Sequence, residues 1–80
     1  MKNKIKIAGV DYKIRDMAVG ESQKLDGAGK IKESAVKRVS ETKYKILVIF
    51  EYSIIDKTFY TFGSMLGYLQ ATYDMHGSII

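Results

Sequence analysis

With 80 residues, the chain can form a single domain, 1–80, close to the lower size at which one apolar core suffices. It contains no cysteine, which excludes disulfides and thiolate metal sites and leaves its stability to apolar burial or self-association. The formal net charge of +4 favours encounters with acidic partners, but it does not distinguish nucleic acid from protein.

Residue types are unevenly distributed along the chain. Of the 13 Lys and Arg, 12 lie in residues 1–45, whereas eight of the nine aromatic residues lie in residues 44–80. We therefore expect the second half to supply most of the core and the first half to supply most of the charged surface.

The beginning of the sequence alternates charged residues with isoleucine and lacks the continuous apolar run of a signal peptide. The longest apolar run, residues 46–50, is far shorter than the roughly 20 residues that span a bilayer. We expect a cytoplasmic protein that has no membrane partner.

The N-terminal residues have the alternation of a β-hairpin. A two-residue loop at 8–9 pairs Ile7 with Val10 and Ile5 with Tyr12, which places all four apolar side chains on one face. The opposite face then carries Lys4, Lys6, Asp11, Lys13 and Arg15. This is the pattern of a hairpin with one buried side.

Residues 16–29 are mostly polar, contain three glycines and show neither the helical nor the strand period. We expect a loop there. So long a loop is unusual in a small domain, so the segment is either a mobile functional loop or contains a short strand that the pattern does not reveal.

The middle segment, residues 30–42, fits two structures. Its apolar side chains lie on one arc of a helical wheel, and Glu33 precedes Lys37 by four residues, the favourable order for a helical ion pair. We favour a helix. The alternative is a strand that starts near Val36, ends in a turn near Thr42 and forms a meander with the next strand.

Residues 44–53 alternate as a strand, and the middle of this strand is apolar on both faces. Such a strand is normally central in its sheet and covered on both sides, by a helix on one side and by a helix, a loop or a partner molecule on the other. Residues 58–62 are the expected return strand after a connection at 54–57. A short helix over 65–74 follows, with Ser64 as its N-cap. The predicted fold class is α+β: an N-terminal hairpin, an uncertain middle segment, a central antiparallel pair and a C-terminal helix.

No motif predicts catalysis, a cofactor or a metal. Residues 26–30 resemble a phosphate-binding glycine loop, but Ile31 stands where such a loop needs Ser or Thr, and Lys24 replaces its first glycine. His76 is the only histidine, and the acidic residues are scattered rather than paired. We therefore expect a protein that is not an enzyme.

The first hypothesis for function is a protein-interaction module that self-associates, as a homodimer, or docks on a macromolecular target. Adaptors and inhibitors of this kind are encoded by mobile elements such as phages. The support is the doubly apolar strand and the six tyrosines, because tyrosine is enriched at interfaces. The candidate interface residues are Tyr44, Tyr52, Tyr60 and Tyr68.

The alternative hypothesis is a basic protein that binds nucleic acid through phosphate contacts. Only two of the 13 cationic residues are arginine, so attraction to the backbone should dominate over base recognition. The candidate contact residues are Lys4, Lys6, Lys13, Arg15, Lys30, Lys32, Lys37 and Arg38.

Overall fold

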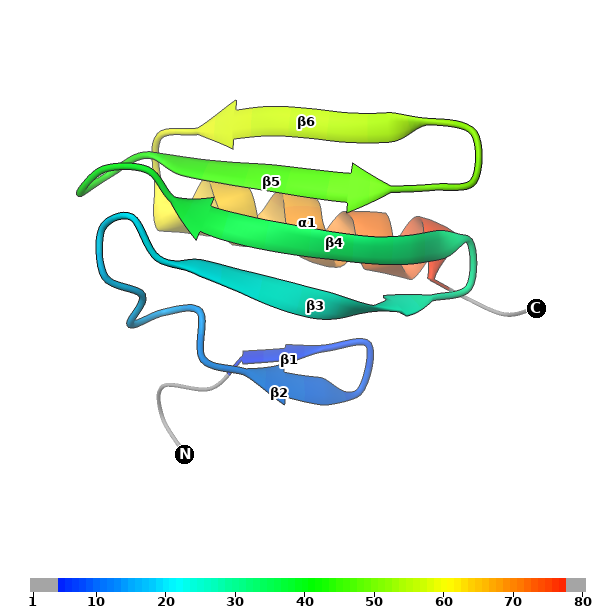
Figure 1. The fold of residues 1–80 in the computed structure, drawn as a ribbon. Coiled ribbons are helices and arrows are strands. Elements are labelled where there is room, and N and C mark those ends of the chain that lie inside the picture. The colour runs from blue at the N-terminus through cyan, green and yellow to red at the C-terminus, as the bar shows by residue number, and fades with distance from the viewer. Residues whose placement is uncertain (1–4, 78–80) are drawn as a thin grey trace.

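The computed structural model describes residues 5–77 and has an α+β fold in which six strands precede one helix (Figure 1). A short hairpin and a four-stranded antiparallel sheet of order β3-β4-β5-β6 make up the β-structure. The elements are β1 (Ile5–Ile7), β2 (Val10–Tyr12), β3 (Ser22–Ala28), β4 (Ile31–Arg38), β5 (Tyr44–Ile49), β6 (Ile54–Phe59) and α1 (Phe62–His76).

The core lies between the four-stranded sheet and α1, which runs behind the sheet in Figure 1. The central strand β5 contributes Ile46 and Val48, and the helix contributes Met65 and Leu69; all four are 0% exposed. Because side chains alternate along a strand, Leu47, which lies between Ile46 and Val48 on β5, points to the other face of the sheet.

The N-terminal hairpin is confirmed in its predicted register, with Ile7 opposite Val10 and Ile5 opposite Tyr12. Its turn residues, Ala8 and Gly9, have φ of 52° and 83°, as a two-residue turn of this hand requires. The two isoleucines are buried, whereas Val10 is 40% exposed. The hairpin lies beside β3 (Figure 1), and the predicted surface residue Lys4 is outside the described residues.

The hairpin is joined to the sheet by a hydrogen bond at the edge strand. The backbone N–H of Asp26 on β3 donates to the hydroxyl of Tyr12 on β2 over 3.0 Å. This contact satisfies one of the backbone donors that an edge strand leaves unpaired.

The helix favoured for the middle segment is wrong, and the strand alternative is right, although β4 begins at Ile31 rather than near Val36. The physical reason is tertiary: β5 is apolar on both faces and needs a strand on each side, and β4 and β6 supply them. Glu33 lies beside Lys24 of the neighbouring strand, with an N–O distance of 3.0 Å, instead of forming the helical pair with Lys37.

Three predicted boundaries also change. The expected loop at 16–29 contains β3, which the pattern hides because one residue of the strand, Leu25, is buried among polar side chains. The central strand ends at Ile49, and the return strand is β6 rather than 58–62, because a tight turn closes where the Phe50 N–H donates to the Ser53 carbonyl over 2.8 Å.

The helix is longer than predicted because its N-cap is Thr61, not Ser64. The hydroxyl of Thr61 accepts a hydrogen bond from the backbone N–H of Ser64 over 3.1 Å, which satisfies one of the free donors of the first turn. The helix therefore begins at Phe62 and reaches His76.

The prediction that the second half of the chain supplies most of the core is also wrong. Within the described residues, seven of the 13 buried apolar side chains precede position 40, and they include four isoleucines. Isoleucine at alternate strand positions fills a core as well as aromatic residues do, whereas a tyrosine is easily left at the edge with its hydroxyl in water.

Candidate protein-contact surfaces

One face of the four-stranded sheet is uncovered. Helix α1 packs on the back of the sheet, and within residues 5–77 no helix or hairpin covers the face that points to the viewer in Figure 1. We call this surface the open sheet face. Its side chains are those of Ser22, Lys24, Asp26, Glu33, Ala35, Lys37, Lys45, Leu47, Ile49, Ile54, Asp56 and Thr58.

The strand register arranges the open sheet face in three rows that run across the strands. One end row is Asp26, Glu33, Ile49 and Ile54; the middle row is Lys24, Ala35, Leu47 and Asp56; the other end row is Ser22, Lys37, Lys45 and Thr58. The face therefore has an acidic end with two isoleucines, a basic end, and an apolar centre.

Like charges stand directly opposite each other at both ends of this face. Asp26 pairs with Glu33, and Lys37 pairs with Lys45. Directly opposed like charges destabilise a sheet by a few tenths to about 1 kcal/mol. Two ion pairs between neighbouring rows offset part of this cost: Lys24 to Glu33 at 3.0 Å, and Lys45 to Asp56 at 3.5 Å.

The apolar side chains on this face are incompletely buried. Ile54 is 63% exposed, and Leu47, Ile49 and Ala35 are half-buried by their own neighbours. A shallow depression of about 250 Å³ runs along Ala35, Leu47 and Ile49. The face thus combines a small apolar strip with charged groups on both sides of it.

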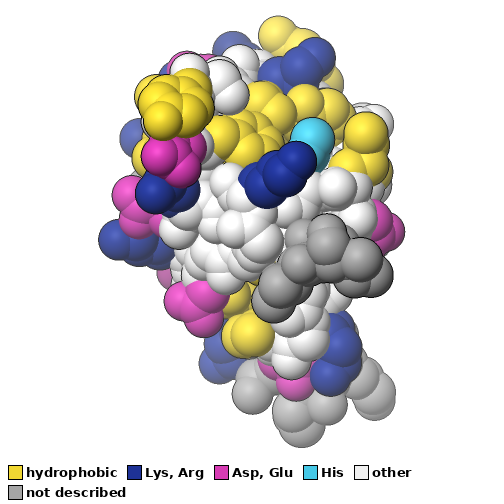
Figure 2. All heavy atoms as spheres, turned by 90° about the vertical axis from the view of Figure 1, so that its right-hand side faces the viewer, with side chains coloured by type: hydrophobic (Ala, Val, Ile, Leu, Met, Phe, Trp, Pro, Cys, Tyr) yellow, Lys and Arg dark blue, Asp and Glu magenta, His cyan; other side chains and the backbone are white. Residues whose placement is uncertain are grey.

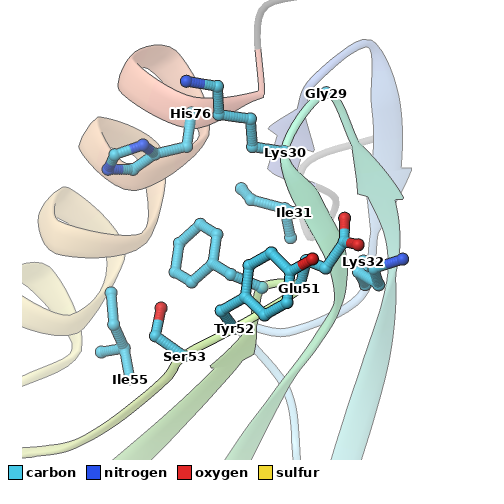
Figure 3. Close-up of a pocket in the computed structure, with 10 residues that line it drawn as sticks. Gly29, Lys30, Ile31, Lys32, Glu51, Tyr52, Ser53, Ile55 and His76 are labelled. Carbon is cyan, nitrogen blue, oxygen red and sulfur yellow. The ribbon is translucent and has the colours of Figure 1, made fainter.

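A larger hollow of about 980 Å³ lies at one end of the molecule, where two strand turns meet the end of α1. Figure 2 looks onto this end, and Figure 3 shows the hollow in close-up. We call it the Phe50 hollow. It is lined by Gly29, Lys30, Ile31, Lys32, Phe50, Glu51, Tyr52, Ser53, Ile55 and His76.

The floor of the Phe50 hollow is apolar. Ile31 is 2% exposed, and Phe50 and Ile55 are partly buried against the core. The His76 ring stands edge-on to Phe50, with ring centroids 5.2 Å apart, and Tyr52 at the tip of the β5–β6 turn is 93% exposed. This arrangement leaves a large ring free beside an apolar cavity, as is common at contact sites.

A backbone hydrogen bond fixes the rim of the hollow. The N–H of Lys30 in the β3–β4 turn donates to the carbonyl of His76 over 2.8 Å, which ties this turn to the end of α1. Gly29 supplies the φ of 55° that the tight turn needs. As a result, Lys30 and His76 lie together on one side of the hollow (Figure 3).

The four candidate tyrosines do not form one surface. Tyr44 is only 6% exposed and packs edge-on against Phe62, with centroids 5.6 Å apart, so it belongs to the core. Tyr60 is 67% exposed near the start of α1, and Tyr68 is half-buried against Phe59. Of the four, Tyr52 is the one that lines the Phe50 hollow.

The candidate basic residues are dispersed over several surfaces. Lys6 on the hairpin faces Asp11, with 3.9 Å between the nitrogen and oxygen atoms, and Arg15 lies over the ring of Phe62. Arg38 has a structural role, because its guanidinium donates to the carbonyls of Met17 and Glu41, each over 2.7 Å. Of the rest, Lys13 is exposed beyond the hairpin, Lys30 and Lys32 line the Phe50 hollow, and Lys37 is on the open sheet face.

Three of the predicted candidates, Lys30, Lys32 and Tyr52, line the Phe50 hollow, but the sequence does not predict that they share one site. It also gives no role there to Phe50, which the pattern places in the central strand, or to His76. A possible signal was the end of the apolar run at Phe50, directly before the polar residues of the turn.

No family model, curated protein or solved structure matches the chain. Among residues 5–77, no group of acidic, histidine or cysteine side chains could hold a metal ion. In the same part of the chain, no helix is long and apolar enough to cross a membrane.

Proposed function

We propose that the protein is a non-enzymatic interaction module that self-associates by packing the open sheet faces of two copies against each other. The observation that carries the proposal is that β5 is apolar on both faces while helix α1 covers only one of them. A second copy is the simplest cover for the other face, since each copy presents the same unfilled surface.

Apolar burial favours this association. Leu47 and Ile49 are half-buried in the single copy, and Ile54 is mostly exposed, so contact with a second copy removes further apolar area from water. At about 25 cal/mol for each Å² removed, the gain is on the order of 1 kcal/mol for each of these side chains. This is a modest driving force, and it has to be supplemented by charge.

The charges at the two ends of the open sheet face complement each other between copies. A twofold axis that crosses the strands at the middle row places Leu47 of one copy on Leu47 of the other, and it also brings Lys24 to Lys24 and Asp56 to Asp56 at the edges of that row. The same rotation exchanges the end rows, so Glu33 of each copy faces Lys37 of the other. The like-charged end rows, unfavourable within one copy, then each meet a row of the opposite or neutral kind.

The size of the face predicts weak association. Four strands about 4.8 Å apart and five residues along each strand give a flat area of roughly 300–400 Å². Stable complexes usually bury about 800 Å² on each partner. We therefore expect a reversible dimer with a dissociation constant in the micromolar range or above, rather than an obligate one.

Sedimentation equilibrium over a concentration range from about 10 µM to about 1 mM tests this proposal. The average mass should rise from the 9.0 kDa of one chain towards twice that value as concentration increases. Leu47→Lys should abolish the rise, because it places two ammonium groups, one from each copy, against each other at the centre of the interface. The matched control is Ala71→Lys on the exposed side of α1, which should associate like the wild type.

The alternative, contact with nucleic-acid phosphates, has less support. The described candidates lie on the hairpin, at the Phe50 hollow and on the open sheet face, so no one surface gathers them. Arg38 is engaged by backbone carbonyls. Phosphate recognition needs several cations along one track, and its affinity falls steeply with salt.

A further inference from the structure

We infer that the Phe50 hollow is a binding site for a carboxylate carried on an apolar chain. The site is formed within one copy of the protein and is independent of self-association through the open sheet face. Its lining combines an apolar floor with a cationic rim, the two features that such a ligand needs.

The floor provides the apolar half of the site. Ile31 is buried, and Phe50 and Ile55 present partly covered side chains to the cavity. Tyr52 stands at the edge of the hollow (Figure 3) and is exposed enough to close over a bound group. An apolar chain placed there removes its own surface and that of the lining from water.

The rim provides the charged half. The side chains of Lys30 and His76 lie on the same side of the hollow, away from Glu51 (Figure 3). Among the ion pairs within 4.0 Å that join residues of the 5–77 region, none involves Lys30. A lysine ammonium beside an imidazole can donate charge-assisted hydrogen bonds to a carboxylate.

The end of α1 lies directly beside Lys30 at the rim of the hollow. The last carbonyls of a helix carry partial negative charge and attract lysine and histidine. The carbonyls of His76 and Tyr73 are already satisfied, by the backbone N–H groups of Lys30 and Gly77, each over 2.8 Å. The backbone of Lys30 is therefore fixed at the rim of the hollow, and its exposed side chain carries the ammonium there.

The charge balance favours a singly charged group. On the side of Lys30, the rim has one ammonium and one imidazole, and the other side carries Lys32 and Glu51 with opposite charges. A carboxylate on an apolar chain occurs both at the end of a polypeptide and in a fatty acid. We assign what these two ligands share, a carboxylate on an apolar chain, and an NMR titration distinguishes a polypeptide end from a fatty acid.

An NMR titration with four probes tests the inference: N-acetyl-Leu-Phe with a free carboxylate, the same peptide as its amide, decanoate, and decanamide. A carboxylate probe should produce saturable shifts at residues 29–32, 50–53 and 76, and its amide counterpart should bind about tenfold more weakly. A response to the peptide alone identifies a polypeptide end, and a response to decanoate alone identifies a fatty chain. Amides that bind as well as carboxylates, or no saturable shift, overturn the inference.

Lys30 and Tyr52 are both exposed, so substitutions at these two positions should leave the fold intact. Lys30→Gln should weaken the carboxylate probes about tenfold and leave the amides unchanged, whereas the control Lys13→Gln should change neither. Tyr52→Ser should weaken all probes that bind, because it removes the wall of the cavity. Leu47→Lys should bind like the wild type, which separates this site from the self-association surface. Equal binding by Lys30→Gln and wild type contradicts the inference.

Discussion

Tyr73 of the helix and Ser34 of β4 share a buried hydrogen bond of 2.7 Å between their side-chain oxygens. The Tyr73 hydroxyl also donates to the backbone carbonyl of Asp26 on β3 over 2.7 Å. Because a phenol has one hydrogen to donate, Ser34 is the donor in the first bond. One side chain thus joins α1 to two strands.

Replacing Tyr73 with phenylalanine should destabilise the fold by about 1–3 kcal/mol, because the Ser34 hydroxyl and the Asp26 carbonyl both lose a partner. Urea unfolding measures the change. Tyr60→Phe removes the same atom from a ring that is 67% exposed and should cost less than about 0.5 kcal/mol. Equal effects of the two substitutions would show that the buried network is not stabilising.

The stability should fall at alkaline pH. Burial, together with the nearby Tyr12 and Asp26, raises the pKa of Tyr73 above its ordinary value of 10.0, and the Ser34 hydrogen bond opposes this only in part. Above pH 10 the unfolded chain loses the Tyr73 proton while the folded chain keeps it, so ionisation favours unfolding. The stability that the protonated Tyr73 hydroxyl contributes is fully present below pH 10, and it is lost as the pH rises through the pKa that Tyr73 has in the folded protein.

Urea unfolding of wild type and Tyr73→Phe at about pH 8, 10 and 11 isolates this effect from the other tyrosines. The stability difference between the two proteins should shrink as the pH increases. A difference that stays constant over this range contradicts the assignment to Tyr73.

The hairpin turn contains backbone strain that a substitution can relieve. Ala8 has a φ of 52°, a conformation that costs an alanine about 1 kcal/mol and that asparagine and glycine adopt more easily. Ala8→Asn should therefore raise the free energy of unfolding by about 0.5–1 kcal/mol. Gly9→Ala is the opposite test: no atom lies within 4 Å of the added methyl group, so its expected loss reports backbone strain alone.

A charge reversal on the open sheet face separates stability from association. Lys37→Glu places a carboxylate directly opposite Lys45 on the neighbouring strand. The free energy of unfolding of the single copy should therefore rise by a few tenths of a kcal/mol. The same change sets the new carboxylate at position 37 against Glu33 of the second copy, so dimerisation should weaken several-fold at low salt.

The double variant Glu33→Lys with Lys37→Glu restores opposite charges between copies and should recover most of the lost association. Sedimentation of the two single variants and the double variant at low and high salt forms a complete cycle. If the double variant associates no better than either single variant, the proposed alignment of the two faces is incorrect.

The elements with strong local patterns were predictable from the sequence. The alternation around residues 8–9 determines the hairpin register, and the doubly apolar run of β5 identifies the central strand. The middle segment was not predictable, because its apolar side chains fit a helical arc as well as a strand. Its conformation is decided by pairing with β5, and a polar residue, Ser34, is buried there because Tyr73 supplies its partner.

The candidate sites were less accessible to sequence reasoning. The doubly apolar β5 predicts cover on both of its faces, and the structure shows α1 on one of them; the rows of like charge on the other face depend on strand register. The Phe50 hollow joins residues 29–32, 50–53, 55 and 76, which come from three separate parts of the chain. No local pattern links two turns to a helix end, so only the folded structure brings Lys30 beside His76.

An isotope-filtered NOE experiment on a mixture of ¹³C-labelled and unlabelled protein tests the self-association surface most directly, because it detects only contacts between copies. The account predicts intermolecular contacts from the methyl groups of Leu47 and Ile49 at concentrations where the average mass exceeds that of one chain. Contacts between copies that arise only from α1 or from the hairpin, or a protein that stays monomeric at about 1 mM, would contradict it.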